Sequence, residues 1–231
     1  HSQSGLGIKV RRMAKRTKIS PSDLTFNLSN CPRCLWLKYT ENLTAPMTMP
    51  LVGDLADLQE KYYVGKPASV ISPDLPEGTI ARHGGWVASK KLVYEGEETE
   101  YMINGKYDLV IEFTDGTIGI IDCKFSAKDS NKSEFYRPQL EAYAYAMENP
   151  AEGDGEKVSV LGLMVWSLPN SLDGEEPGVN VNTSWQPVDR DPAKFETTIN
   201  KLFKIINGPK PATVDNCNNC TYVKRRHQLL L

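Results

Sequence analysis

Residues 105–124 read GKYDLVIEFTDGTIGIIDCK, and the interpretation of the whole chain depends on this stretch. Two largely apolar runs flank Thr114-Asp115-Gly116-Thr117, a composition typical of a tight hairpin turn. The turn predicts two neighbouring strands, with Asp108 near the middle of the first and Asp122 and Lys124 in the second. Because residues two apart in a strand point to the same face, Asp122 and Lys124 should project together.

Two carboxylates held this close repel each other, and each raises the pKa of the other unless a cation lies between them. Mg²⁺ suits such a site because it takes oxygen ligands and retains bound water. A lysine beside the ion can orient that water or stabilise developing negative charge. The alternative is an exposed Asp–Lys pair at a strand end. Against it, Ile118, Ile120 and Ile121 precede the pair and indicate a buried strand, where an unpaired charge is costly.

The composition is that of an ordinary globular protein. The chain has 231 residues, of which 40% are hydrophobic and 24% are charged. Its formal net charge is −2, so any contact with a polyanion must come from local basic patches, here residues 9–18 and 224–227. Each patch could equally be a solvated tail. We expect residues 1–19 to form a basic N-terminal arm and residues 20–231 to form one domain.

The sequence gives no indication of a membrane partner. No apolar run approaches the roughly 20 residues that a span requires, and no hydrophobic signal-peptide core follows the basic start. We therefore expect an intracellular, cytoplasmic protein.

Hydrophobic periodicity predicts an α/β fold. A helix capped by Ser20 or Ser22 should run into Cys31, and a second helix should cover residues 50–63. The apolar face of this second helix would comprise Leu51, Leu55, Leu58 and Tyr62. The remaining predicted elements are strands over 86–94, 100–113, 118–125 and 157–167 and helices over 134–147 and 192–206. This order indicates a mixed central β-sheet flanked by helices.

Two Cys-x-x-Cys pairs lie near the two ends of the chain: Cys31 with Cys34, and Cys217 with Cys220. Each pair can chelate a metal, and two pairs make a four-thiolate site that holds either zinc or an iron–sulfur cluster. Disulfides are the weaker alternative because no secretion signal is present. We expect a structural centre that joins the N- and C-terminal segments. The fifth cysteine, Cys123, should be a core residue.

The sequence resembles the PD-(D/E)XK nuclease superfamily, and within it the RecB-type exonucleases, a branch that includes nucleases of CRISPR spacer acquisition. The resemblance rests on Gly-x-x-Asp, then Ile-Asp-x-Lys after the turn, then Gln-x-x-x-Tyr in the following helix, and it covers about residues 20–222. It implies a restriction-endonuclease-like core and hydrolysis of phosphodiester bonds with Mg²⁺ or Mn²⁺.

The resemblance also implies a role for each residue of the motif. The metal ligands would be two carboxylates and one backbone carbonyl: Asp108, Asp122 and Cys123. Lys124 would be the catalytic lysine. Gln139 and Tyr143, one turn apart on one helix face, would support the site or contact DNA, with helix packing as their alternative role.

Members of this branch usually carry a further metal-facing residue, often histidine, on an early helix after a glycine. Here Gly53 precedes such a position, and Asp57 stands where histidine is common. Aspartate can bind Mg²⁺. Alternatively, Asp57 pairs with Lys61 four residues later. Asp54 and Glu60 are the reserve candidates for this ligand.

The branch commonly holds an iron–sulfur cluster through one early and three late cysteines, whereas this chain has two and two. Zinc ribbons place their two pairs only about 15–20 residues apart, far closer than here. The resemblance therefore favours a 4Fe–4S cluster, with Zn²⁺ as the alternative.

Three functional hypotheses follow. The first is a metal-dependent deoxyribonuclease; by resemblance it would be an exonuclease on single-stranded DNA ends. Its partner would be a helicase or a CRISPR or repair protein, since this chain has no helicase motif. The second is a non-catalytic nucleic-acid-binding or scaffold protein, and the third is a structural zinc protein in which Asp-x-Lys is a coincidence. Six aromatic residues could stack on bases, although a core role fits most of them better: Trp36, Tyr39, Tyr62, Tyr63, Trp86 and Trp185.

Overall fold

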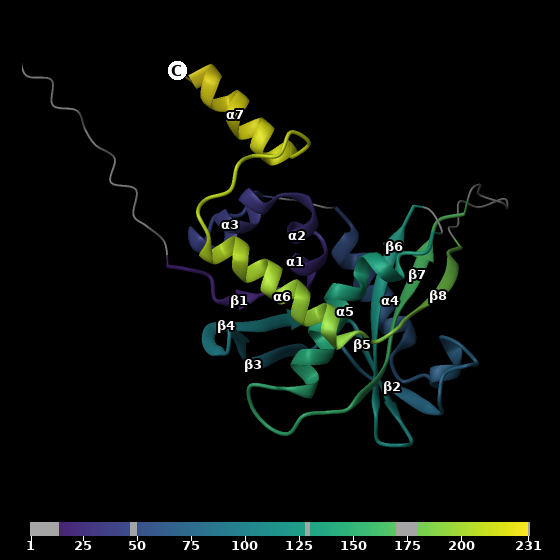
Figure 1. Ribbon diagram of the computed structural model, residues 1–231. Coiled ribbons are helices and arrows are strands. Elements are labelled where there is room, and N and C mark those ends of the chain that lie inside the picture. The colour runs from purple at the N-terminus through teal and green to yellow at the C-terminus, as the bar shows by residue number, and fades with distance from the viewer. Residues whose placement is uncertain (1–13, 47–49, 128–129, 170–179, 231) are drawn as a thin grey trace, which may run out of the picture.

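The computed structural model describes residues 14–46, 50–127, 130–169 and 180–230 (Figure 1). Two mixed β-sheets are flanked by helices, as in a restriction-endonuclease-like core. The predicted mixed α/β fold is thus confirmed. Residues 1–13, which include part of the expected basic arm, lie outside the described ranges.

The strands are β1 Lys18–Ile19, β2 Gly78–His83, β3 Trp86–Tyr94, β4 Glu97–Lys106, β5 Leu109–Phe113, β6 Ile118–Ser126, β7 Val158–Ser167 and β8 Asn182–Val188. The helices are α1 Pro21–Thr25, α2 Asn27–Asn30, α3 Pro32–Thr40, α4 Val52–Tyr63, α5 Ser133–Glu148, α6 Pro192–Asn207 and α7 Asn218–Leu230, with a 3₁₀ turn, η1, at Ala68–Val70. None of the helices in the described part of the chain is long and apolar enough to cross a membrane.

The larger sheet has the order β2-β5-β6-β7-β8, in which β6 and β7 are parallel and the other pairs are antiparallel. Its two faces have different cover. Ile118 and Ile120 belong to the apolar cluster under α5. Ile121 and Cys123 belong to the cluster that Tyr63 of α4 and Ala68 of η1 complete on the other side. Alternation along β6 therefore places Asp122 and Lys124 on the α5 face.

The smaller sheet, β1-β4-β3, is joined to the larger one by a single bent hairpin. One arm of the hairpin contains β2 and β3, and the other contains β4 and β5. At the bend, the Gly84 N–H donates to the Asp108 carbonyl and the Tyr107 N–H donates to the Gly85 carbonyl, each at 2.9 Å. Gly84 has φ +59°, and a Cβ on Gly85 would lie 2.2 Å from the Tyr107 hydroxyl, so both positions require glycine.

This bend corrects one sequence prediction. The strand expected over residues 100–113 is two strands, β4 and β5, which lie in different sheets. Asp108 consequently lies between them, at the junction of the two sheets, and not in the middle of a strand. The reason is the glycine pair at positions 84–85, which lets the chain turn from one sheet into the other.

The N-terminal helix expected to run from Ser20 into Cys31 is also wrong, because two short helices, α1 and α2, occupy that region and a third, α3, begins after Cys31. Pro32 restricts the residue before it, and Cys31 is accordingly extended, with φ −149° and ψ 107°. The three helices are held by buried Asp23, which accepts hydrogen bonds from Lys38 at 2.7 Å and from Tyr39 at 2.5 Å.

Helix α4 forms where it was expected but buries a neighbouring face, because Leu55 is half-buried and Gln59, Glu60 and Tyr63 are buried. Leu58 and Tyr62 of the predicted apolar face are 59% and 51% exposed, whereas Gln59 and Glu60 are buried. Burial of these polar groups is tolerated because each has a partner from a distant strand. The Gln59 side-chain amide donates to the carbonyl of Met164 at 2.7 Å. Glu60 lies near the Lys106 ammonium and the His83 imidazole at the sheet junction, as described below.

Candidate active site and thiolate centre

The carboxylate of Asp122 is the buried centre of the candidate active site. The Lys124 ammonium, two residues later on the same face of β6, forms an ion pair with it. From α5, the Gln139 amide donates to the other Asp122 oxygen, Oδ1, at 2.8 Å. The Lys124 Nζ atom also lies 4.8 Å from the centroid of the Tyr136 ring. The strand therefore supplies the charges, and the helix fixes their orientation.

Asp108 reaches the same centre from the junction of the two sheets. Its Oδ2 atom accepts a hydrogen bond from the Cys123 N–H at 2.7 Å. Burial of the carboxyl and, next, the charge of Asp122 raise the pKa of Asp108 from 3.8 to about 7. Lys124 offsets only part of this. The fold thus holds the two carboxylates where their charges repel each other, and a further cation between them would offset this repulsion.

Lys124 stays protonated in this environment. Burial alone would lower the pKa of its ammonium, but the charges of Asp122 and Asp108 outweigh burial and raise that pKa. A lysine that holds its proton cannot serve as a general base. It can stabilise negative charge that develops beside it, and the low local dielectric strengthens that effect.

The Cys123 side chain takes no part in the charged cluster. It packs on the other face of β6, among Ile80, Leu109 and Met164. Burial and, after it, the charge of Asp108 raise the pKa of the thiol, which therefore stays neutral. What Cys123 offers the site is its backbone, and the N–H already binds Asp108.

Two acids of α4 approach the site to different extents. The Asp57 side chain is 56% exposed, and its Oδ1 atom lies 3.9 Å from Lys106 Nζ. The Glu60 side chain is only 4% exposed, lies 3.9 Å from the same Nζ atom and is 3.4 Å from His83 Nδ1. The charge of Glu60 also contributes to the raised pKa of Asp108. Glu60, a reserve candidate in the sequence, is therefore the buried acid that α4 turns toward Asp108.

Gln139 and Tyr143 hold the site from α5. The Tyr143 hydroxyl donates to the Lys106 carbonyl at 2.6 Å and so ties the end of β4 to the helix. Burial, followed by the charges of Asp122 and Asp108, raises the pKa of the Tyr143 phenol, which stays neutral. The Gln139 Oε1 atom is buried without a hydrogen-bond partner among the described residues. An unpartnered oxygen beside two carboxylates suits a hydrated divalent cation.

The four cysteines of the two Cys-x-x-Cys pairs meet in a second cluster, between the starts of α3 and α7. Their Sγ atoms all lie within 4.8 Å of one another. The Sγ separations are 3.8 Å for Cys31–Cys220, 3.6 Å for Cys34–Cys217 and 3.7 Å for Cys34–Cys220. A tetrahedral ion with bonds of about 2.3 Å to sulfur separates its ligands by about 3.8 Å. The thiols are thus spaced to hold a metal.

This cluster is what holds α7 to the rest of the chain. Figure 1 shows α7 extending away from the two sheets, and residues 222–229 are exposed. Within the described residues, the side-chain hydrogen bonds that join α7 to another part of the chain are those of Cys220 with Cys31 and Cys34. A bound metal would therefore fix the position of the whole helix.

Comparison with known proteins places the chain in a family. Residues 54–225 match the PD-(D/E)XK nuclease superfamily, and the chain belongs to it. No curated protein matches the chain. Among solved structures, the crystal structure of SSO0001 is similar at 16% identity and a TM-score of 0.48; the match covers 86% of this chain and 81% of that one. Membership of this superfamily supports a nuclease-type function with a nucleic-acid substrate and a divalent metal.

Proposed function

We propose that this protein is a deoxyribonuclease of the RecB-like type that hydrolyses phosphodiester bonds, with single-stranded DNA ends as its substrate. The observation that carries the proposal is the cluster of Asp108, Asp122 and Lys124, one half-buried and one buried carboxylate with one ammonium at the junction of the sheets. The raised pKa of Asp108 supports it, because a divalent cation would offset the mutual repulsion of the carboxylates.

The residues present fit Mg²⁺ or Mn²⁺, since the donors are oxygens. Asp108 and Asp122 would hold the ion, with the Cys123 carbonyl and an acid of α4. On burial, we propose Glu60 as that acid ahead of Asp57, the first choice from the sequence. The bound ion would supply an activated water and neutralise charge on the scissile phosphate.

The protein side chains then have separable tasks. Lys124 stabilises negative charge on the phosphate, because its ammonium is retained and partly desolvated. Gln139 fixes the orientation of Asp122. Tyr143 fixes the end of β4, two residues before Asp108. A shift of either support would misplace a carboxylate without removing it.

For the thiolate centre we propose a structural metal. The sequence resemblance favours a 4Fe–4S cluster, but the Sγ separations near 3.7 Å support a single tetrahedral ion such as Zn²⁺. In a cluster each cysteine binds a different iron, which holds the sulfurs farther apart. Metal content and visible absorption distinguish the two, because iron–sulfur clusters are coloured and Zn²⁺ is not.

The test of the nuclease is cleavage of end-labelled DNA by wild-type protein and the Lys124→Ala variant, with Mg²⁺, with Mn²⁺ and without added metal. Lys61→Ala removes an exposed lysine of α4 and is the matched control. We expect metal-dependent cleavage that Lys124→Ala abolishes and Lys61→Ala retains. Labels at either end report polarity, and circular single-stranded DNA separates exonuclease from endonuclease.

Equal cleavage by Lys124→Ala would contradict the role of that lysine. No cleavage by wild-type protein with a filled thiolate centre would favour a nucleic-acid-binding scaffold. A helicase or a CRISPR or repair protein as partner is proposed on the sequence resemblance, and co-purification from the native source tests it.

A further inference from the structure

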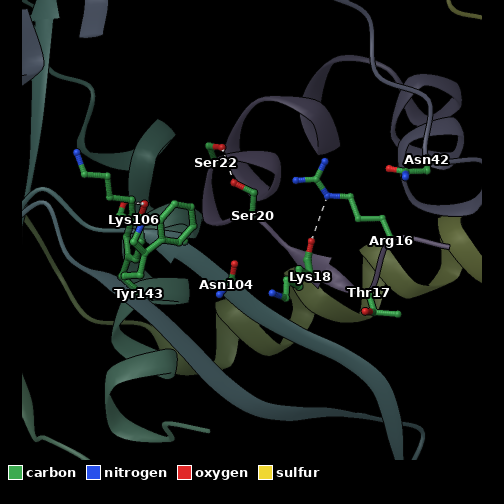
Figure 2. A pocket seen from close by; sticks show the side chains of 11 residues that line it. Arg16, Thr17, Lys18, Ser20, Ser22, Asn42, Asn104, Lys106 and Tyr143 are labelled. Carbon is green, nitrogen blue, oxygen red and sulfur yellow. Dashed lines mark hydrogen bonds between the residues drawn. The ribbon is translucent and has the colours of Figure 1, made fainter. Parts of the chain in front are cut away.

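A cleft of about 650 Å³ lies between the segment that leads through β1 into α1 and the adjoining ends of β3 and β4 (Figure 2). Its lining includes three cationic side chains, Arg16, Lys18 and Lys106, and six hydroxyl or amide side chains. Within the described part of the chain, no carboxylate lines it. In a chain of net charge −2, this composition concentrates positive charge in one concave place and selects an anionic ligand.

The polar wall of the cleft is internally ordered. The Arg16 Nε–H donates to the Lys18 carbonyl at 3.4 Å, and the Ser20 and Ser22 hydroxyls share a hydrogen bond at 2.9 Å. Among the described residues, no hydrogen bond or ion pair takes up the terminal nitrogens of Arg16, so they can bind a ligand. A guanidinium with neighbouring hydroxyls is suited to phosphate oxygens.

The cleft also contains an exposed aromatic ring. Trp86 is 71% exposed, although its indole is among the most apolar groups of the chain. In the smaller sheet it pairs in register with Lys106. Sites for single-stranded nucleic acid combine cations that follow the backbone with aromatic rings on which bases stack. A base inside a duplex has both faces covered and cannot use such a ring.

The cleft adjoins the acidic site through Lys106. The Lys106 Nζ atom lies 3.9 Å from Glu60, and its carbonyl accepts the Tyr143 hydroxyl. Figure 2 shows the Tyr143–Lys106 contact at one end of the cleft and Arg16 toward the other. A strand lying in the cleft would therefore end beside Asp108.

We propose that this cleft binds an unpaired nucleic-acid strand that leads to the acidic site. Arg16 and Lys18 contact its phosphates, and Trp86 stacks on one of its bases. The proposal rests on the proposed function, because it takes the acidic site as the place of cleavage. It adds the surface that selects a single strand over a duplex.

The test measures binding, so that it does not depend on cleavage. Fluorescein-labelled oligo-thymidylate and a duplex of equal length are titrated by anisotropy, on a Lys124→Ala background without added divalent metal. Three changes are compared: Trp86→Ala, the pair Arg16→Ala with Lys18→Ala, and the control pair Lys90→Ala with Lys201→Ala. The control lysines are exposed and lie outside the cleft lining.

Loss of one stacking contact predicts about 5- to 150-fold weaker binding of the single strand by Trp86→Ala and unchanged binding of the duplex. The double change at Arg16 and Lys18 should reduce the slope of log affinity against log salt by about 1.4, at about 0.7 for each phosphate contact. The control pair should leave the slope for the single strand unchanged. Trp86→Phe, which keeps a ring, should restore most of the affinity.

Unchanged single-strand binding by Trp86→Ala, or equal losses from the cleft pair and the control pair, would overturn the proposal. Cleavage assays keep it distinct from the proposed function. If the enzyme is active and the cleft variants have the same KM for DNA as the wild type, only the cleft proposal is refuted. If the cleft variants lose binding but the wild type never cleaves DNA, only the proposed nuclease function is refuted. Melting temperatures of the variants show whether each one folds.

Discussion

The raised pKa of Asp108 predicts that the candidate site destabilises the metal-free fold at neutral pH. The rise from 3.8 to about 7 corresponds to about 4 kcal/mol, at about 1.4 kcal/mol for each pH unit. Because the folded chain binds this proton more tightly than the unfolded chain, stability should fall as pH rises from about 4 to about 7 and then level off.

Replacing Asp108 with asparagine removes the ionisable group and keeps an oxygen that can accept the Cys123 N–H. We expect Asp108→Asn to raise the free energy of unfolding of the metal-free protein at pH 8 by about 2–4 kcal/mol, because some relaxation of the site offsets the full value. At pH 4 the wild type and Asp108→Asn should have nearly equal free energies of unfolding. Urea denaturation without added divalent metal measures both values.

Mg²⁺ should make the wild type more stable than Asp108→Asn, because it binds the wild-type carboxylates in the folded chain only. Millimolar Mg²⁺ should therefore stabilise the wild type and have little effect on Asp108→Asn. The reasoning would be refuted if the wild type and the variant showed the same dependence of stability on pH between 4 and 8. It would also be refuted if Mg²⁺ stabilised both proteins equally.

Two further predictions concern the framework. The double change Cys217→Ser with Cys220→Ser should remove the metal from the thiolate centre and release α7. Limited proteolysis should then cut residues 208–217 faster while the sheets stay protected. Unchanged metal content in this variant would contradict the assignment of these cysteines as metal ligands. Gly85→Ala should lower the free energy of unfolding by about 1–3 kcal/mol, because its Cβ would lie 2.2 Å from the Tyr107 hydroxyl. Gly53→Ala, which meets nothing within 4 Å in α4, should raise it by up to about 1 kcal/mol, and equal effects would refute the steric argument.

Local sequence patterns predicted the parts of the fold that local forces determine. The turn at 114–117 and the elements α5, β7 and α6 lie close to their expected bounds, because each has a strong hydrophobic period or a clear turn composition. The less apolar strands β2 and β8 were not predicted, and neither was the largely polar helix α7. Their positions depend on neighbouring strands or on the cysteine cluster, which no local period records.

The candidate site, too, has a part that local sequence predicts and a part that depends on distant residues. The proximity of Asp122 and Lys124 follows from strand alternation alone. The position of Asp108 could not be derived fully, because it depends on Gly84 and Gly85, some twenty residues earlier in the chain. The burial of Glu60 could not be predicted for a similar reason. The hydrophobic period of α4 predicts burial of its leucines, and the partners that stabilise a buried Glu60 come from the distant strands β2 and β4.

The bent hairpin has a consequence for the assembly of the candidate site. Each of its arms contributes a strand to both sheets, and the backbone hydrogen bonds at the bend join Asp108 to Gly84 and Tyr107 to Gly85. Pairing of β5 with β6 in the larger sheet brings Asp108 close to Asp122, but the hydrogen bond from Tyr143 to the Lys106 carbonyl also requires β4 of the smaller sheet. The candidate site therefore has all its supports only when both sheets have formed, and a chain that lacks the smaller sheet would hold Asp108 less firmly.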